Sequence, residues 1–189
     1  MEIQINEKPN GFVEVVQKGV LGMSVTTVIP PDRMELRNIM KDPLGNEVRL
    51  THSREAHWQT AHSHIGIKEH YTVLYGWIAI ATMVGKNNFK IDFIVSQPNS
   101  LARRTLDTKE SHNVFLPKGA VISVTKEGVP VPNKQGDDWY DDKALDGLLR
   151  EVTLESLMAK ANNDGIQLER EFPTPKLPES TPREILKFL

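Results

Sequence analysis

The chain has 189 residues, of which 39% are hydrophobic and 25% are charged, and its formal net charge is −2. This composition is that of a globular protein with one domain and appendages. The near-neutral charge and the pI of about 6.3 give no electrostatic basis for binding nucleic acid or an anionic membrane. Neither is therefore expected as a partner.

The sequence contains no cysteine, which excludes disulfide bonds and thiolate chemistry and is compatible with a reducing cytoplasm. Residues 1–11 lack the basic-then-apolar order of a signal peptide. No apolar run approaches the roughly 20 residues that a membrane-spanning helix needs. We therefore expect a cytoplasmic protein without a membrane segment.

In chain order, segments rich in β-branched and aromatic residues alternate with turns that contain Gly, Pro and Asn. Residues 1–10 are expected to form an arm that pairs with another strand or another subunit, and residues 32–40 fit neither the strand nor the helix period. The predicted strands are 12–18, 20–29, 47–52, 57–64, 69–75, 77–84, 89–95, 101–106, 113–116 and 120–126. About ten short strands with few helical signals are typical of an all-β sandwich or barrel.

The pattern changes after Gly128, which divides the chain into a barrel domain (1–128) and an appendage (129–189) that packs on the barrel or on a partner subunit. Within the appendage, short helices are predicted at 143–150, capped by Asp141 or Asp142, and at 153–161, capped by Thr153. A Pro-rich segment (169–180) and a last amphipathic helix (181–189) follow.

Two surfaces favour a homodimer. The predicted strand 77–84 is almost entirely apolar, which suits either a strand covered on both faces or a subunit interface. The last predicted helix is too short to be stable alone and must dock on its own barrel or on a partner. A homodimer is therefore the expected assembly.

The residues best suited to bind a metal lie in one stretch, which has the order H-x-H-x4-E-x6-G and contains His62, His64, Glu69 and Gly76. Two histidines that are two residues apart on a strand leave the same face, with about 6–7 Å between them. A carboxylate arriving from the next strand can complete one face of an octahedral metal site. His62, His64 and Glu69 are therefore the predicted metal ligands.

At these residues the chain resembles the cupin family, whose first signature is G-x5-H-x-H-x3,4-E-x6-G; here Ala56 replaces the leading Gly. The second signature, G-x5-P-x-G-x2-H-x3-N, is similar to the stretch that contains Pro117 and Gly119. The resemblance implies an antiparallel β-barrel or jelly roll with a site in its mouth, to which the residue pattern after Gly128 adds a mainly helical, extended C-terminal appendage.

The resemblance also implies a divalent transition metal (Fe, Mn, Ni, Co or Zn), but the family's fourth ligand is missing. That position falls at Ile122 or Ser123, so the site has three ligands or has lost its metal. By the family's register, His112 follows a turn at the end of the barrel away from the metal, and we expect it to be a turn or surface residue. His70 follows Glu69 directly and should point to the opposite face.

Further candidates for the pocket are less specific. Tyr71 shares the Glu69 face and can serve as a proton donor or a substrate hydrogen bond, or it is simply a core aromatic. Arg103 and Arg104 are adjacent, so one of them faces inward, where it would fix a carboxylate or phosphate; Arg104 is the candidate. The tryptophans are expected in the core or at an interface: Trp58, Trp77 and Trp139.

Three functions follow from the resemblance. The first is a metal-dependent enzyme that acts on a small molecule, a sugar-type isomerase or epimerase of carbohydrate metabolism. The second is an iron-dependent dioxygenase that uses the same ligands. The third is a non-catalytic ligand-binding cupin that has lost its metal. No nucleophile elbow, P-loop, dinucleotide fingerprint or zinc-finger spacing occurs.

Overall fold

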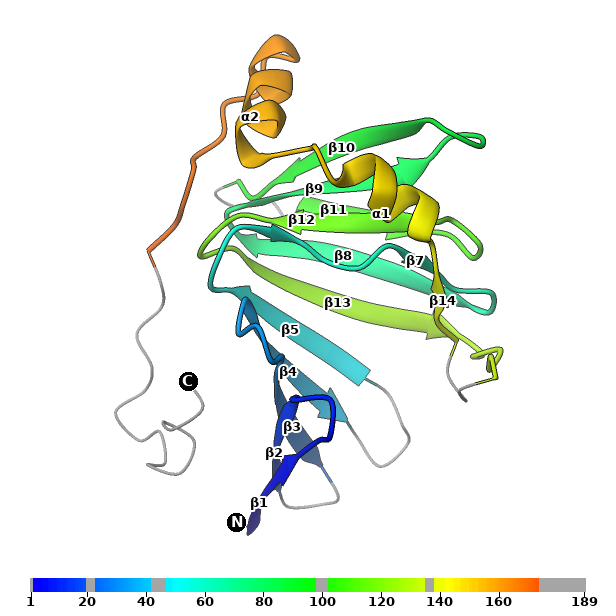
Figure 1. The fold of residues 1–189 in the computed structure, drawn as a ribbon. Helices are drawn as coiled ribbons and strands as arrows, with labels where there is room; N and C mark the ends of the chain where they lie inside the picture. The colour runs from blue at the N-terminus through cyan, green and yellow to red at the C-terminus, as the bar shows by residue number, and fades with distance from the viewer. Residues whose placement is uncertain (1, 20–22, 42–46, 98–101, 135–137, 174–189) are drawn as a thin grey trace.

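The computed structural model describes residues 2–19, 23–41, 47–97, 102–134 and 138–173. Strands predominate in these ranges, and the two helices found there follow the strands of the barrel (Figure 1). The strands are β1 (Glu2–Glu7), β2 (Val13–Lys18), β3 (Ser24–Ile29), β4 (Glu35–Lys41), β5 (Glu47–Ser53), β6 (His57–Trp58), β7 (His62–Ser63), β8 (Ile67–Tyr75), β9 (Trp77–Met83), β10 (Phe89–Val95), β11 (Ala102–Leu106), β12 (His112–Leu116), β13 (Val121–Gly128) and β14 (Tyr140–Asp141). The helices are α1 (Lys143–Leu149) and α2 (Leu154–Asn163).

The strands form two antiparallel sheets that pack face to face. The first sheet has the order β1-β2-β3-β4-β5-β13-β8-β11, and the second has the order β10-β9-β12-β7-β14, with β6 paired to β12. Buried side chains from both sheets meet in one core: Tyr71, Val73, Leu106, Ile122 and Val124 from the first sheet, and Ile78, Ile80, Ile94, Val114 and Leu116 from the second. The structure is the cupin-type jelly roll expected from the sequence, and the all-β prediction is confirmed.

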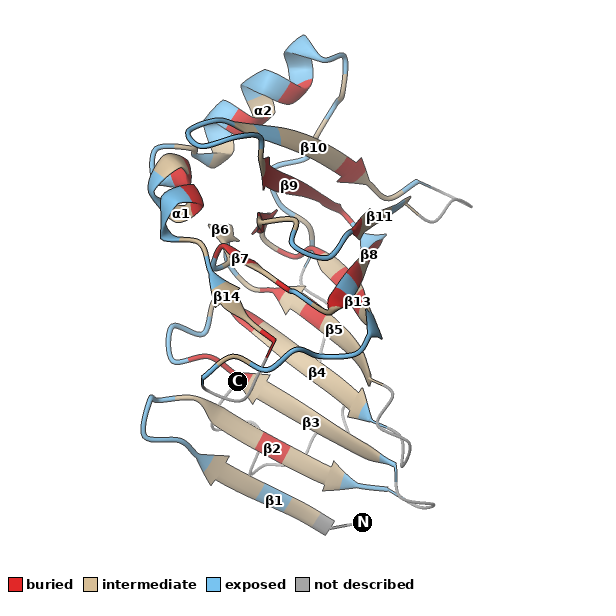
Figure 2. Cartoon of the chain, turned by 90° about the vertical axis from the view of Figure 1, so that its right-hand side faces the viewer, coloured by how far each residue is buried: buried red, intermediate tan, exposed pale blue. Residues whose placement is uncertain are grey.

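The N-terminal strands β1–β4 extend the first sheet beyond the barrel (Figure 2). The expected arm pairs within its own chain, since β1 lies antiparallel to β2 from Glu2↔Lys18 to Glu7↔Val13. The segment without a clear period becomes β4, which pairs with β3 on one side and β5 on the other. Pairing on both edges supplies the hydrogen bonds that local sequence preference did not indicate.

The predicted single strand 57–64 is wrong, because the structure divides it into β6 and β7. Polar side chains form hydrogen bonds with backbone groups of the segment between the two strands. The Asn113 amide donates to the Gln59 carbonyl (2.8 Å), and the Asp146 carboxylate of α1 accepts from the Ala61 N–H (2.8 Å). The Gln59 N–H still donates to the Val114 carbonyl of β12 (2.9 Å), so it is the bonds to Asn113 and Asp146 that interrupt the strand before the histidines.

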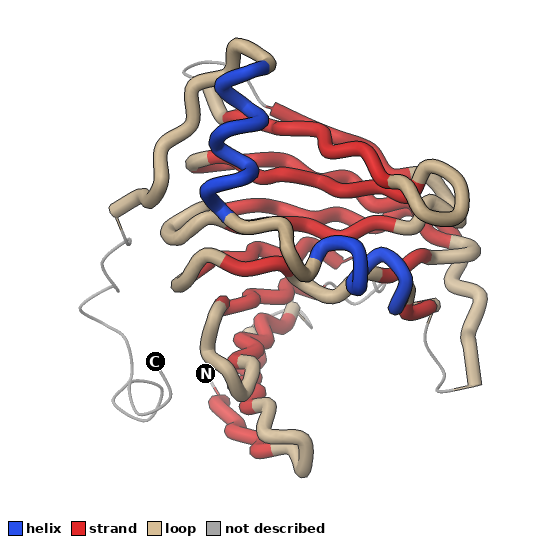
Figure 3. Tube along the Cα trace, turned by 45° about the horizontal axis from the view of Figure 1, so that its top comes forward, coloured by secondary structure: helices blue, strands red, loops and turns tan. Residues whose placement is uncertain are grey.

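Both helices lie along the outer face of the second sheet (Figure 3). Leu145 of α1 packs in one cluster with Ala81, and Leu157 of α2 packs in another with Trp77. The apolar strand β9 is therefore covered on both faces by its own chain, which is one of the two arrangements expected. A partner subunit is not needed to bury it.

The helix caps follow the sequence prediction. Asp142 accepts from the backbone N–H groups of Ala144 and Leu145, and Thr153 accepts from that of Ser156. The predicted last helix lies outside the described residues. Neither helix in the described part of the chain has the length and apolar character that crossing a bilayer requires.

Candidate metal centre

The strand register places several polar side chains on one face of the first sheet. Glu69 lies opposite Lys126 of β13, and Tyr71 lies opposite Val124 of the same strand. Val124 in turn lies opposite Arg49 of β5. Directly paired residues in antiparallel strands point to the same side of a sheet. Residues far apart in the sequence therefore share the inner face of the barrel.

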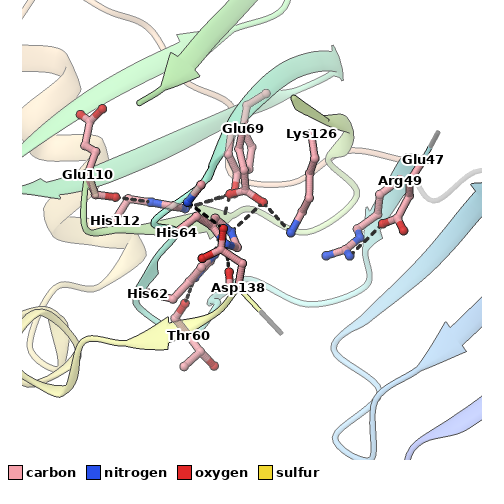
Figure 4. A network of polar contacts seen from close by, with 12 residues as sticks. Glu47, Arg49, Thr60, His62, His64, Glu69, Glu110, His112, Lys126 and Asp138 are labelled. Carbon is pink, nitrogen blue, oxygen red and sulfur yellow. Dashed lines mark hydrogen bonds and ion pairs between the residues drawn. The ribbon is translucent and has the colours of Figure 1, made fainter. Parts of the chain in front are cut away.

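The three predicted ligands converge. One nitrogen each of His62 and His64 and one oxygen of Glu69 lie within 4.8 Å of one another. His62 Nε2 is 3.7 Å from Glu69 Oε2, and His64 Nε2 is 3.3 Å from Glu69 Oε1. All three residues are buried, with exposures of 3–4%, and their side chains point towards one another in Figure 4. The convergence holds although the two histidines do not share one continuous strand.

His112 also belongs to this cluster, so the expectation of a turn or surface histidine is wrong. Its Nε2 lies 3.1 Å from Glu69 Oε2, and its ring centroid is 4.4 Å from that of His62 (Figure 4). The cause is strand pairing, because β12 places His112 directly opposite His62. Ile122, at the family's usual ligand position, is fully buried in the apolar core. The fourth candidate ligand, which is the third imidazole, therefore comes from a different strand.

Backbone carbonyl groups fix the orientation of all three imidazoles. His62 Nδ1 donates to the Thr60 carbonyl (2.9 Å), His112 Nδ1 donates to that of Glu110 (2.9 Å), and His64 Nδ1 donates to that of Asp138. A carbonyl oxygen can only accept, so each Nδ1 carries a proton. In the neutral ring each Nε2 then presents its lone pair towards Glu69.

The donor set fits a divalent transition metal. The Nε2 atoms of His62 and His64 are buried and have no hydrogen-bond partner among the described residues. Burial lowers the pKa of His62 to about 4, against the opposing effect of the Glu69 carboxylate, so this ring is neutral at pH 7. An imidazole lone pair and a carboxylate that face each other repel, and a cation bound between them removes this repulsion.

Glu69 is held in its ionised form. Burial alone would raise the pKa of its carboxyl, but the neighbouring imidazoles of His112, His62 and His64 and the charge of Lys126 outweigh this and lower the pKa well below its usual value. Lys126 Nζ lies 3.2 Å from Glu69 Oε1. An ionised carboxylate is the form that binds a metal.

Tyr71 lies on the Glu69 face, as the alternation of the strand predicts. Its hydroxyl donates to Glu69 Oε2 at 2.9 Å. Burial and the neighbouring Glu69 charge raise the pKa of the phenol well above its usual value. Tyr71 therefore keeps its proton and orients the carboxylate. His70, on the opposite face as expected, contacts Thr105 and Glu127.

Two residues of the appendage complete the site, and sequence reasoning did not identify them in this role. The Asp138 carboxylate accepts from the backbone N–H groups of Ile65 (2.8 Å) and Gly66 (2.9 Å), which fixes the turn after His64. The Trp139 ring stacks on His62, with centroids 3.4 Å apart and planes 10° from parallel. A loop rich in Asp and Trp beside a short strand is the only local signal of this role.

A cavity of about 220 Å³ opens beside His62 and Glu69. Its lining residues are Phe12, Arg37, Arg49, Thr51, Gln59, Thr60, His62, Glu69, Tyr71, Val124 and Trp139. The arginines of the cavity are thus Arg37 and Arg49, which sequence reasoning did not single out. They lie on strands whose alternation of polar and apolar residues resembles that of an ordinary solvent-exposed face.

Arg104, the predicted catalytic arginine, is not among the residues that line this cavity. Its backbone lies opposite Tyr71 in the β8–β11 pair, as expected for an inward-facing position. Its guanidinium, however, turns to Glu110 (3.2 Å) and Asp92 (3.6 Å). These two carboxylates hold the side chain away from the histidines. Its neighbour Arg103 is exposed.

Comparisons with known proteins find no matching family model and no matching curated protein. Among solved structures, the capsular polysaccharide assembling protein CapF from Staphylococcus aureus is 17% identical with a TM-score of 0.43, over 74% of this chain and 34% of that one. Oxalate decarboxylase from Bacillus subtilis is 14% identical with a TM-score of 0.43, over 76% and 38%. The cupin domain of CENP-C from Drosophila melanogaster is 8% identical with a TM-score of 0.38, over 60% and 70%.

The chain thus spans about a third of the length of the CapF chain that it resembles. At these identities and TM-scores the similarities carry no information on function. The assignment of the fold rests on the strand order of the two sheets and on the position of the histidine motif within them.

Proposed function

Because the chain has the cupin fold and three histidines and a glutamate surround one point within it, we propose that it is a metal-binding cupin that acts on a small molecule. The observation that carries this proposal is the pair of buried Nε2 atoms of His62 and His64, which face Glu69 without a hydrogen-bond partner among the described residues. Imidazole and carboxylate together suit Fe, Mn, Ni, Co or Zn.

His62, His64, Glu69 and His112 would hold the metal. A metal held by these residues would supply Lewis-acid or one-electron chemistry. The protein's own contribution is orientation: three carbonyl groups fix the rings, Tyr71 fixes the carboxylate, and Asp138 fixes the turn after His64.

Of the two expected reaction classes, the cavity favours oxygen-dependent chemistry over isomerisation or epimerisation. Moving a proton between carbon atoms requires a base beside the substrate. Apart from the ligands, the residues that line the cavity offer no carboxylate and no histidine. The Tyr71 hydroxyl keeps its proton and donates a hydrogen bond to Glu69, and His112 is 1% exposed and does not line the cavity. An isomerase would therefore lack a proton acceptor there.

The metal is tested first. Protein purified without chelator, and the same protein reconstituted with Fe²⁺, Mn²⁺, Ni²⁺, Co²⁺ or Zn²⁺, is expected to retain about one equivalent after desalting. His64→Ala should lose this metal, whereas His70→Gln, on the opposite face of β8, should keep it. Less than a tenth of an equivalent in the wild type after reconstitution would exclude the metal centre and leave a non-catalytic ligand-binding cupin.

The reaction class is tested second. Fe²⁺-loaded protein is offered a panel of aldoses, 2-hydroxy acids and 2-oxo acids in an oxygen electrode, and the same panel is incubated in deuterium oxide. Oxygen uptake without deuterium incorporation supports the oxygen-dependent class. Deuterium incorporation at carbon without oxygen uptake would favour the isomerase or epimerase.

A further inference from the structure

The cavity beside the metal centre is lined by both charged and apolar groups. The polar groups come from Arg37, Arg49, Thr51 and Gln59. The apolar surface comes from the rings of Phe12 and Trp139 and the side chain of Val124. The volume of about 220 Å³ lies below the roughly 300–1,000 Å³ of sites for drug-sized ligands. The cavity therefore suits a small molecule with one polar end.

Arg49 has hydrogen-bonding capacity that the described residues leave unused. Its Nη2 donates to Glu47 Oε1 at 3.1 Å, but its Nε–H is buried and has no partner among them. A guanidinium binds an oxyanion best through two parallel N–H groups. An unpartnered Nε–H at the wall of a cavity is thus one arm of such a pair.

The charge on this wall is not fully balanced. Glu47 is the only carboxylate that the described structure pairs with Arg49, and it also pairs with Lys41 (3.0 Å), so two cations share one carboxylate. Arg37, which lies across from Thr51 in the next row of the same face, is paired with the buried Glu35. A divalent metal at Glu69 would add further positive charge.

The positive groups also reach the reacting end of the cavity. The strand register puts Arg49, Val124 and Tyr71 in one row across three neighbouring strands, about 10 Å from end to end at the spacing of adjacent strands. Figure 4 shows the Arg49 guanidinium on the same side of the site as Lys126. Arg49, His62 and Glu69 line the same cavity of about 220 Å³, so a small ligand in it could touch Arg49 and the metal centre at once.

We propose that the cavity takes a small organic oxyanion whose anionic group binds to Arg49 while a neighbouring oxygen faces the metal centre. A carboxylate or a phosphate monoester would provide that group. The contact between the neighbouring oxygen and the metal rests on the proposed function. The contact between the anionic group and Arg49 does not, because it depends only on the residues that line the cavity. Arg49 is then the residue that selects anionic over neutral ligands.

Binding of three probes to the Co²⁺-loaded protein tests the proposal by calorimetry: lactate as a carboxylate, methyl phosphate as a phosphate monoester, and lactamide as the neutral counterpart of lactate. At least one anion should bind about tenfold or more tightly than lactamide. Arg49→Gln should weaken that anion about tenfold and leave lactamide unchanged. Arg49→Lys should recover part of the loss, and Arg103→Gln, an exposed arginine on β11, should have no effect.

Equal binding of lactate, methyl phosphate and lactamide, or an unchanged anion affinity in a folded Arg49→Gln protein, would overturn the proposal. Circular dichroism establishes that each variant is folded. The Co²⁺ content is measured before each titration, so a wild type without Co²⁺ contradicts the proposed function separately. The titrations are then repeated on apoprotein. If Arg49→Gln loses the preference for anions there, the result supports the anion site. If Arg49→Gln keeps that preference, the result refutes the anion site.

Discussion

His112 Nε2 and Glu69 Oε2 lie 3.1 Å apart in a fully buried contact, although 43 residues separate the two in the chain. The contact joins β12 of one sheet to β8 of the other and so closes the candidate site across the barrel. His112 is also the fourth candidate ligand in a chain whose second motif has Ile122 where a ligand is expected.

Replacing His112 should weaken metal binding. His112→Ala removes one of four proposed ligands, and changes even at outer-shell groups typically cost about 10–100-fold in metal affinity. We expect a loss of at least this size for Co²⁺, measured by competition with a chromophoric chelator. His70→Gln is the matched control, because His70 lies on the outer face of β8 and contacts Glu127. An unchanged affinity in His112→Ala would reduce the site to three ligands.

Tyr71→Phe should destabilise the metal-free protein. The substitution removes the only phenol that donates to Glu69 in the described structure, and a hydrogen bond to a charged group contributes about 1.5–3 kcal/mol. Urea unfolding should show a decrease of that order in the free energy of unfolding. Tyr75→Phe, at an exposed position on the same strand, should change it by less than about 0.5 kcal/mol. Equal stability of the two variants would contradict an orienting role for Tyr71.

Stability should depend on Glu35 in acid. Burial raises the pKa of Glu35, but hydrogen bonds from His57 and Gln59 and the charge of Arg37 outweigh it and lower the pKa from 4.5 to about 2. A lowered carboxyl pKa contributes stability above the unfolded-state value, and this contribution is lost as the pH falls from about 4.5 towards 2. The shift corresponds to about 3 kcal/mol.

The measurement is the difference in unfolding free energy between the wild type and Glu35→Gln at pH 7, 5, 4 and 3. This difference should not fall between pH 7 and 5, because protonation of His57, whose pKa Glu35 raises, adds to it there, and it should shrink below about pH 4.5. Glu55→Gln, which replaces an exposed acid, should show no such trend. A difference that is the same at pH 7 and pH 3 would refute the assignment to Glu35.

The helical appendage should stabilise the barrel. Leu157 of α2 is fully buried and packs in one cluster with Trp77 and Phe115. Leu157→Ala should lower the free energy of unfolding by about 2–5 kcal/mol, because it leaves a cavity between the helix and the sheet. Lys160→Ala, which removes only an exposed ion pair with Asp164, should cost less than about 0.5 kcal/mol. If both variants unfold alike, α2 does not contribute to the core.

The homodimer stays a prediction, with a different structural basis. Since α1 and α2 cover β9, a candidate for contact between copies among the described residues is the edge of the first sheet, where β1 is a terminal strand. Terminal strands present unpaired backbone groups that pair readily with a second chain. Light scattering is expected to give the mass of two chains, and a monomer at all concentrations would contradict it.

The sequence alone was sufficient for the barrel and for half of the site. Alternation and turn residues predicted most strands because β-branched and aromatic runs bounded by Gly, Pro and Asn have few other structures available to them. The spacing of His62, His64 and Glu69 is local, so it identified the three residues that converge. The helix caps Asp142 and Thr153 could likewise be predicted from the sequence, since a cap acts within one turn of helix.

The tertiary structure alone decided how distant strands align. Whether His112 faces His62 or the solvent depends on the pairing of β12 with β7, and a shift of one residue would reverse it. In the same way, Arg49 rather than Arg104 reaches the cavity because carboxylates on neighbouring elements hold Arg104 elsewhere. Local sequence determines what a segment can be, whereas pairing between segments determines which side chains meet.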